Sequence, residues 1–181
     1  MDFVSHVLVG KLFQVKSQVD SLKNKLIVIV AAFAPDIPVL FVYLLLGHEK
    51  GRAFWIPYNS DWVGVRLAHP GWAAIWEIPH SIFFVLLIVI PLVLYFRWPK
   101  IAIASYLSHI ALDLFTHTGE WGIKPFYPLN FIVNGFTDAW AWPLPYMAIS
   151  WLILLVAIYL SRRSLKQKTA EQPQNSGHDH G

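Results

Sequence analysis

Residues 26–47 read LIVIVAAFAPDIPVLFVYLLLG and contain a single charged residue, Asp36. A helix of about 20 apolar residues is long enough to cross the hydrocarbon core of a bilayer. A charged carboxylate inside such a helix costs ~2.5 to 3.5 kcal/mol on insertion scales, so a partner should compensate it. Pro35 and Pro38 interrupt the helical hydrogen bonds around Asp36. We therefore predict a broken membrane-spanning helix with a compensated Asp36. The alternative is an Asp36 that is protonated or that caps a helix end.

The composition of the whole chain agrees with a membrane location. Of its 181 residues, 56% are hydrophobic and 14% are charged, which is more apolar surface than a soluble domain of this size can easily bury. Three further apolar segments approach the length of a span, at residues 71–96, 101–117 and 140–160. Residues 2–19 place apolar side chains at helical spacing and predict a helix that is amphipathic or partly inserted. The expected fold is an all-α, polytopic membrane bundle with about four transmembrane helices.

The basic residues predict how this bundle is oriented. Ten of them lie before the first span, between the second and third spans, or after the last span: Lys11, Lys16, Lys23, Lys25, Arg97, Lys100, Arg162, Arg163, Lys166 and Lys168. The positive-inside rule places these residues, and with them both termini, in the cytoplasm. Residues 161–181 are polar and predict a disordered cytoplasmic tail. Residues 1–160 are expected to form one membrane-embedded domain.

The residue types restrict the chemistry that such a bundle can carry. The chain has no Cys, which excludes disulfides and thiolate metal ligands, so any metal site must use His and carboxylate side chains. The formal charge of +3 comes partly from basic residues beside the spans, and we expect no nucleic acid partner from it. The expected partner of the surface is the lipid bilayer.

One apolar segment carries three polar residues at helical spacing. His109, Asp113 and His117 follow one another at intervals of four residues, so on a helix they lie along one face. Neighbouring pairs in such a row are ~5 to 6 Å apart at Cβ, close enough for a shared metal ion to bridge them. A plain hydrogen bond between His and Asp inside a bundle explains the same spacing equally well.

Depth in the membrane connects this row to the other apolar segments. At a rise of 1.5 Å per residue, Asp36, His80, His109 and Asp113 lie ~12 to 18 Å from the predicted starts of their spans. All four can therefore meet near the middle of the bilayer. Two imidazoles and two carboxylates suit zinc, or manganese or iron if further oxygen ligands join, and zinc is our first choice. A lone His at the position of His80 is otherwise more often a capping or interfacial residue.

A metal at this position would favour hydrolysis. An open coordination position lowers the pKa of bound water toward ~7 and supplies a hydroxide nucleophile. Glu77, His117 and Glu120 are near the expected ligands in sequence and are the candidates for a catalytic, proton-handling group. Buried ionisable residues also mark ion and proton pathways. The alternative function is therefore a metal or ion transporter, or a membrane protein that binds metal without catalysis.

Short motifs in a fixed order give the chain a family resemblance. They are His6 with Gly10, Pro35 with Asp36, His80 with Ser81, and Ser108, His109, Asp113 and Thr116. In these motifs the chain resembles the bacterial inner-membrane metal-dependent hydrolase family, which is distantly similar to zinc-dependent phospholipase C. The resemblance implies a multi-pass protein of the inner membrane that hydrolyses an ester or phosphoester of a small molecule or lipid. It also implies that His6 is a fifth metal ligand, although alone His6 would pass for a surface residue.

The middle motif departs from the pattern of that family. The family often has His-Arg-Gly-x-Thr-His-Ser, whereas residues 75–81 read IWEIPHS, so the first His is missing. Glu77 lies near that position but at a different helical angle. The resemblance therefore leaves the number of metal ions open, and it leaves open an inactive or binding-only relative.

Overall fold

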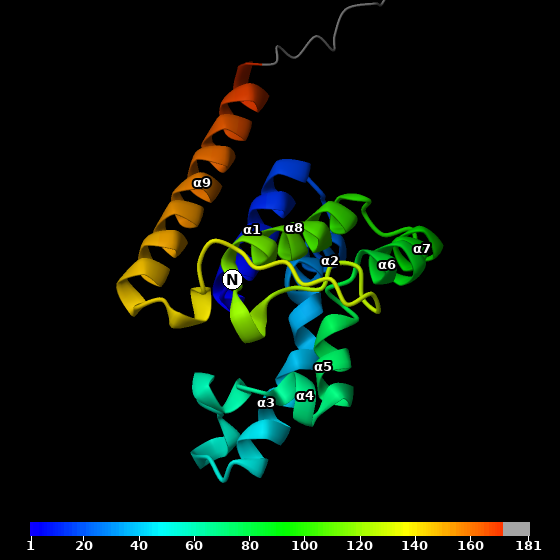
Figure 1. The fold of residues 1–181 in the computed structure, drawn as a ribbon. Helices are drawn as coiled ribbons and strands as arrows, with labels where there is room; N and C mark the ends of the chain where they lie inside the picture. Colours follow the sequence, from blue (N-terminus) through cyan, green and yellow to red (C-terminus); the bar gives the residue numbers. More distant parts are fainter. Residues whose placement is uncertain (172–181) are drawn as a thin grey trace, which may run out of the picture.

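The computed structural model describes residues 1–171, which form helices and connecting loops (Figure 1). The α-helices are α1 (Phe3–Ser17), α2 (Leu22–Phe33), α3 (Ile37–Glu49), α4 (Val65–Ala68), α5 (Pro70–Glu77), α6 (Ile82–Phe84), α7 (Ile90–Tyr95), α8 (Ile101–Thr116) and α9 (Leu144–Glu171). Short helical turns between them are η1 (Ala34–Asp36), η2 (Ala53–Trp55), η3 (Asn59–Trp62), η4 (Val85–Val89), η5 (Gly119–Trp121) and η6 (Ala139–Ala141). The predicted all-α class is confirmed.

The lengths of these helices define which segments can cross a membrane. Leu22–Glu49, which comprises α2, η1 and α3, has 28 residues, and Leu144–Thr169 in α9 has 26, so both are long and apolar enough. The pair Pro70–Glu77 and Ile82–Tyr95 makes a third span if its 56° bend lies within one crossing. Helix α8 has 16 residues, about 24 Å at 1.5 Å per residue, which is short of a ~30 Å core. The described residues thus hold two or three candidate spans, and the predicted count of four is not confirmed.

The first span is broken where its sequence carries prolines. Helix α2 ends at Phe33, the 3-10 turn η1 follows, and α3 begins at Ile37. Pro35 and Pro38 lack the backbone N–H groups that would continue the helical ladder, so this turn leaves carbonyl groups for other donors. The break places Asp36 at the junction of α2 and α3, where its side chain faces α8.

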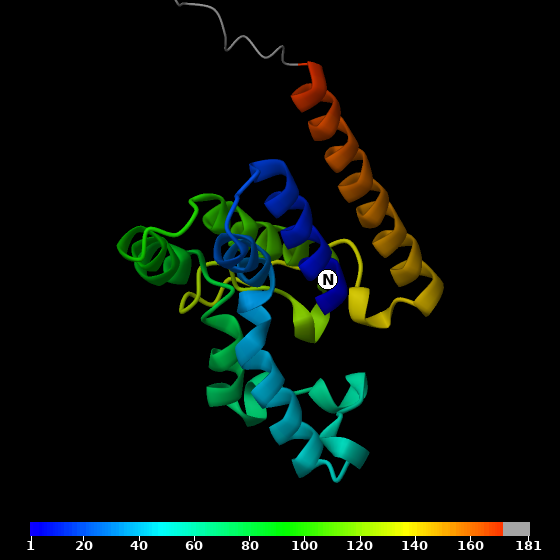
Figure 2. The same cartoon turned by 180° about the vertical axis from the view of Figure 1, so that it is seen from behind.

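Helix α1 packs against α2, α8 and α9 (Figures 1 and 2). Its buried residues are mostly polar or small and include Ser5, His6, Gly10 and Gln14, whereas Val4 is 45% exposed. A helix of a water-soluble protein turns its apolar stripe inward. In a lipid solvent the apolar side can face outward at little cost, and here the polar side faces the bundle. Residues 2–19, predicted to form an amphipathic or partly inserted helix, thus form a helix whose buried side is mainly polar or small.

Gly10 allows α1 and α2 to approach closely. A Cβ atom at this position would lie 2.7 Å from Ala32 Cβ and 2.9 Å from the Ile29 carbonyl oxygen. We expect Gly10→Ala to push the two helices apart and to lower the free energy of unfolding by about 1 to 3 kcal/mol, as overpacking does elsewhere. Thermal unfolding of the purified protein in detergent measures the effect.

The matched control for this change is Gly71→Ala. A Cβ atom at Gly71 has no neighbour within 4 Å, so this variant should unfold at the temperature of the wild type. Equal melting of all three proteins would show that α1 and α2 do not pack as closely as the structure describes.

The loops after α3 and after α8 meet through an aromatic group. It is made of Trp62 in η3, Trp76 in α5 and Trp121 in η5, with the Trp62 and Trp121 rings 4.6 Å apart. Arg52 donates two hydrogen bonds to Asp61, of 2.6 and 2.8 Å, and these bonds lower the pKa of Asp61 to about 2. Both loops are thus ordered parts of the fold.

Helix α9 continues further than its composition suggested. Residues 161–171 were predicted to be part of a disordered tail, but the helix runs through them to Glu171. They contain Leu, Ala, Lys, Arg, Gln and Glu, which are good helix formers, and no Pro or Gly occurs before Pro173. The rest of the predicted tail, 172–181, lies outside the described residues.

Candidate metal centre

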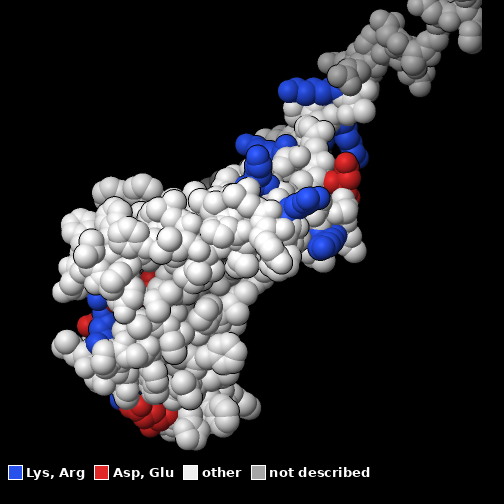
Figure 3. All heavy atoms as spheres, turned by 90° about the vertical axis from the view of Figure 1, so that its right-hand side faces the viewer, with Lys and Arg blue, Asp and Glu red and all other residues white. Residues whose placement is uncertain are grey.

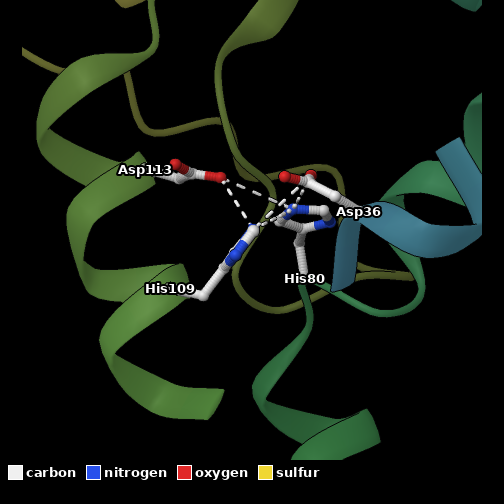
Figure 4. Close-up of side chains that lie close together, drawn as sticks. All are labelled: Asp36, His80, His109 and Asp113. Carbon is white, nitrogen blue, oxygen red and sulfur yellow. Dashed lines mark hydrogen bonds and ion pairs between the residues drawn. The ribbon is translucent and has the colours of Figure 1, made fainter. Parts of the chain in front are cut away.

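Four side chains predicted to bind metal meet at one point of the bundle (Figure 4). Asp36 comes from η1, His80 from the break between α5 and α6, and His109 and Asp113 from α8. One ligand atom from each residue lies within 4.8 Å of the others. We call these four residues the Asp36 group. Its histidines and Asp113 are buried, and Asp36 is nearly so.

The two imidazoles of the Asp36 group are held by backbone carbonyls. His80 Nδ1 donates to the Trp76 carbonyl at 2.7 Å, and His109 Nδ1 donates to the Ala32 carbonyl at 2.8 Å. A carbonyl only accepts, so each Nδ1 carries a proton, and in a neutral ring Nε2 then carries a lone pair. The two Nε2 atoms are 3.1 Å apart. Two facing lone pairs repel, so a cation beside both nitrogens, or a proton shared between them, would stabilise the pair.

The separations within the Asp36 group fit one small divalent cation. His80 Nε2 and His109 Nε2 lie 3.7 and 3.6 Å from Asp36 Oδ1, and 3.5 and 3.1 Å from Asp113 Oδ2. Zinc binds His and carboxylate ligands at about 2.0 to 2.2 Å, so neighbouring ligands of a tetrahedral ion lie about 3.3 to 3.6 Å apart. The five separations, including the 3.1 Å between the two Nε2 atoms, and the donor types make the four residues a possible site for one divalent metal ion.

The other carboxylate oxygen of Asp113, Oδ1, faces a second set of nitrogen atoms. Oδ1 lies 3.0 Å from His6 Nε2 and 3.2 Å from His117 Nε2. The amino group of Met1 donates to Asp113 Oδ1 and lies 2.8 Å from His117 Nε2. We call His6, His117 and Asp113 the His6 group. The His6 ring stacks on His109 at 3.7 Å, so the two groups are in direct contact through Asp113 and these rings.

Helix α1 is fixed at its first turn, which positions His6. Asp2 caps the helix by accepting from the Ser5 backbone N–H at 3.0 Å. The Trp151 indole of α9 donates to the same Asp2 oxygen at 2.9 Å. The sequence contains a helix-capping signal at Asp2, but nothing in it pairs Trp151 with a residue 149 positions earlier. These two residues were not among the predicted site residues.

The three candidates for a proton-handling role lie in different surroundings. Glu77 Oε1 is 3.2 Å from Arg66 Nε and 2.9 Å from Lys124 Nζ, which makes it the centre of a buried ion cluster. Glu120 lies in η5 and forms no ion pair within the described part of the chain. His117 touches Asp113 directly. Within residues 1–171, His117 is therefore the proton-handling candidate that contacts a predicted metal ligand.

Known protein families include one that fits this chain along nearly its whole length. The model of the family described as YdjM inner membrane protein matches residues 1–175, out of 181. The matched part includes every residue of the Asp36 group and the His6 group. Comparisons with curated proteins and with solved structures give no match.

Proposed function

The chain belongs to the YdjM inner membrane protein family, and from that premise we propose that it is a multi-pass, metal-dependent hydrolase of the bacterial inner membrane. The observation that carries the proposal is the arrangement of His80 and His109. Their Nδ1–H groups are donated to carbonyls, and their Nε2 lone pairs face each other at 3.1 Å beside two carboxylates. A divalent cation would make such an arrangement favourable, because it attracts both nitrogens and both carboxylates at once, whereas a shared proton would join the two nitrogens alone.

Hydrolysis follows from what the Asp36 group can bind. Asp36, His80, His109 and Asp113 would hold a divalent metal, with zinc as the first choice, which when bound would lower the pKa of water toward ~7 and so supply a nucleophile for an ester or phosphoester. Asp36 and Asp113 provide the negative charge that a divalent ion requires. The Trp76 and Ala32 carbonyls orient the two imidazoles, as outer partners of metal ligands commonly do. The Nε2 atom of His117 faces Asp113, so its Nδ1 atom, which is buried without a hydrogen-bond partner in the described residues, is the one positioned to hold or move a proton.

We further propose that the His6 group holds a second cation. Asp113 offers one oxygen to each group, so its carboxylate would be a ligand of both ions, and the second ion would take the place of the Met1 amino group at Oδ1. His6 and His117 lie at 3.0 and 3.2 Å from Oδ1, close to the separations within the Asp36 group. The resemblance that implied a role for His6 as a ligand agrees with this position.

The proposed orientation places both termini in the cytoplasm. Basic side chains gather at the end of the molecule where α9 ends (Figure 3). The connection between α7 and α8 contains Arg97, Trp98 and Lys100. Its Trp98 side chain lines an apolar groove together with Leu22 and Lys23, which lie at the start of the first span. The connection between α7 and α8 thus lies near the basic end. This supports four passes, in which the bent α5 to α7 segment and α8 form the middle two.

Metal analysis tests the proposal directly. We expect purified wild-type protein supplied with zinc to retain one to two metal ions per chain, measured by elemental analysis. His80→Ala should lose the ion of the Asp36 group, whereas His6→Ala should lose the ion of the His6 group and keep the other, because each removes one nitrogen from one group. Well-folded wild-type protein without bound metal would contradict the proposal.

The metal-loaded protein also separates hydrolysis from the alternative functions. Ester, phosphoester and phospholipid substrates are incubated with the protein in detergent, and a hydrolase releases product there in a metal-dependent manner. A transporter instead moves its ion across sealed vesicles without breaking a bond. Flux without product formation would assign the buried His and Asp residues to transport.

A further inference from the structure

A hollow of about 390 Å³ lies where α1, α2 and α9 meet, at the basic end of the bundle. Its polar lining consists of Lys11, Gln14, Gln18, Asp20, Lys25 and Arg162. These residues come from the end of α1, the turn after it, the first turn of α2 and the last part of α9. The hollow is separate from the Asp36 and His6 groups and contains none of their residues.

The cations of this hollow face one another with little compensation. Lys11, Lys25 and Arg162 form no ion pair with a carboxylate within the described residues, and Asp20 is the single acidic residue of the lining. Burial lowers the pKa of Lys11, and the nearby charges of Arg162 and Lys25 lower it further. Three cations from three helices that lie close enough to repel one another create a strongly positive site, which an anion would stabilise.

The depth of the hollow suggests where that anion comes from. Lys25 lies in the first turn of α2, at the start of the first candidate span. Arg162 follows the uninterrupted apolar run of α9, which ends at Leu160. Both therefore lie where the hydrocarbon core gives way to the lipid headgroups. Basic pockets between membrane helices on the cytoplasmic side are suited to anionic lipid headgroups.

The side chains match a phosphate ester that also carries hydroxyl groups. The guanidinium fork of Arg162 and the ammonium of Lys25 suit phosphate oxygens. Lys11 Nζ donates to Gln14 Oε1 at 2.6 Å, which holds that ammonium at the wall of the hollow. The Asp20 carboxylate can accept hydrogen bonds from hydroxyl groups. We propose that the hollow binds the headgroup of an anionic glycerophospholipid whose phosphate carries a hydroxylated substituent, such as phosphatidylglycerol.

This site would link the lipid to the helix that carries His6. Lys11 lies five residues after His6 on α1, and Arg162 lies on α9, which also holds the start of α1 through Trp151 and Asp2. A lipid bound between these cations offsets their repulsion and holds α1 against α9. Lipid that binds only the folded protein also raises its stability by mass action.

The experiment measures lipid binding to the purified full chain in neutral detergent by native mass spectrometry, with phosphatidylglycerol and phosphatidylcholine as probes. Wild type should prefer phosphatidylglycerol. Lys11→Gln with Arg162→Gln should weaken phosphatidylglycerol binding about 10- to 30-fold, since each cation near the membrane surface contributes about a fivefold effect. The control, Arg163→Gln with Lys166→Gln, removes the same charge from α9 residues outside the hollow and should change binding less than threefold.

Three further measurements keep the outcome decisive. The single variant Lys25→Gln should weaken binding about fivefold, and a cooperative thermal unfolding transition of every variant in lipid-free detergent shows that the bundle is folded. An equal loss in the control variant, or no loss in the double variant, would overturn the site. Free glycerol phosphate is the last probe. If it binds the wild type with the same affinity as the lipid and does not bind the double variant, the assignment to a membrane lipid is overturned.

Discussion

Changing Asp113 to Asn is expected to leave the purified protein almost free of metal, with affinity more than about 100-fold below that of the wild type. Asp113 directs one oxygen at His80 and His109 and the other at His6 and His117. The amide of Asn at this position keeps one acceptor oxygen. Its NH₂ group takes the place of the other oxygen and points at histidine nitrogens whose lone pairs should face a cation. The variant also loses one of the two negative charges of the Asp36 group. Elemental analysis after dialysis against buffered zinc measures the loss.

Asp138→Asn is the matched control for Asp113. Asp138 accepts a hydrogen bond from the Trp140 backbone N–H at 3.0 Å and lies outside both ligand groups. Asn fills this capping role equally well, so the metal content should equal that of the wild type. Retention of the full metal content by Asp113→Asn would show that neither group binds through this carboxylate.

Changing Glu77 to Gln should cause the largest loss of stability among single changes outside the ligand groups. Glu77 is 4% exposed and lies between Arg66 and Lys124, which are 14% and 15% exposed. Removal of its charge leaves two largely buried cations without their partner, a change that costs about 3 to 5 kcal/mol in comparable buried pairs. Thermal unfolding in detergent measures this, and the metal content should stay at the wild-type level.

Glu120→Gln serves as the comparison, because it makes the same chemical change at a residue without an ion pair in residues 1–171. It should alter the free energy of unfolding by less than about 0.5 kcal/mol. The pair of variants also tests the proton-handling role predicted for Glu77. A Glu77→Gln protein that is as stable as wild type but no longer hydrolyses substrate would favour that role over the structural one.

The meeting of Asp36, His80, His109 and Asp113 could be predicted without a structure. Each lies in an apolar segment at a similar depth, and a bilayer offers no water to solvate a charged side chain. Such residues must turn toward one another, and the helical rise gives their level. The four-residue spacing of His109 and Asp113 then places them on one face of α8.

Other parts of the site could not be predicted from the pattern along the chain. By itself His6 fits an exposed position, and its burial depends on Gly10, which lets α1 approach α2, and on Trp151, which holds Asp2. Glu77 is near His80 in sequence, but its partners come from two separate segments, Arg66 from α4 and Lys124 from the loop after η5. The extension of α9 to Glu171 also differs from what the polar composition suggested.

By itself, the sequence determined that this is a helical membrane protein with His and Asp side chains turned inward, because apolar length and the cost of buried charge are local properties of each segment. Only the tertiary structure decided which residues those side chains contact. It placed Asp113 between two pairs of histidines, gave Glu77 to Arg66 and Lys124, and gathered three cations around one hollow. These are contacts between distant segments, and they depend on which helices pack together and how closely.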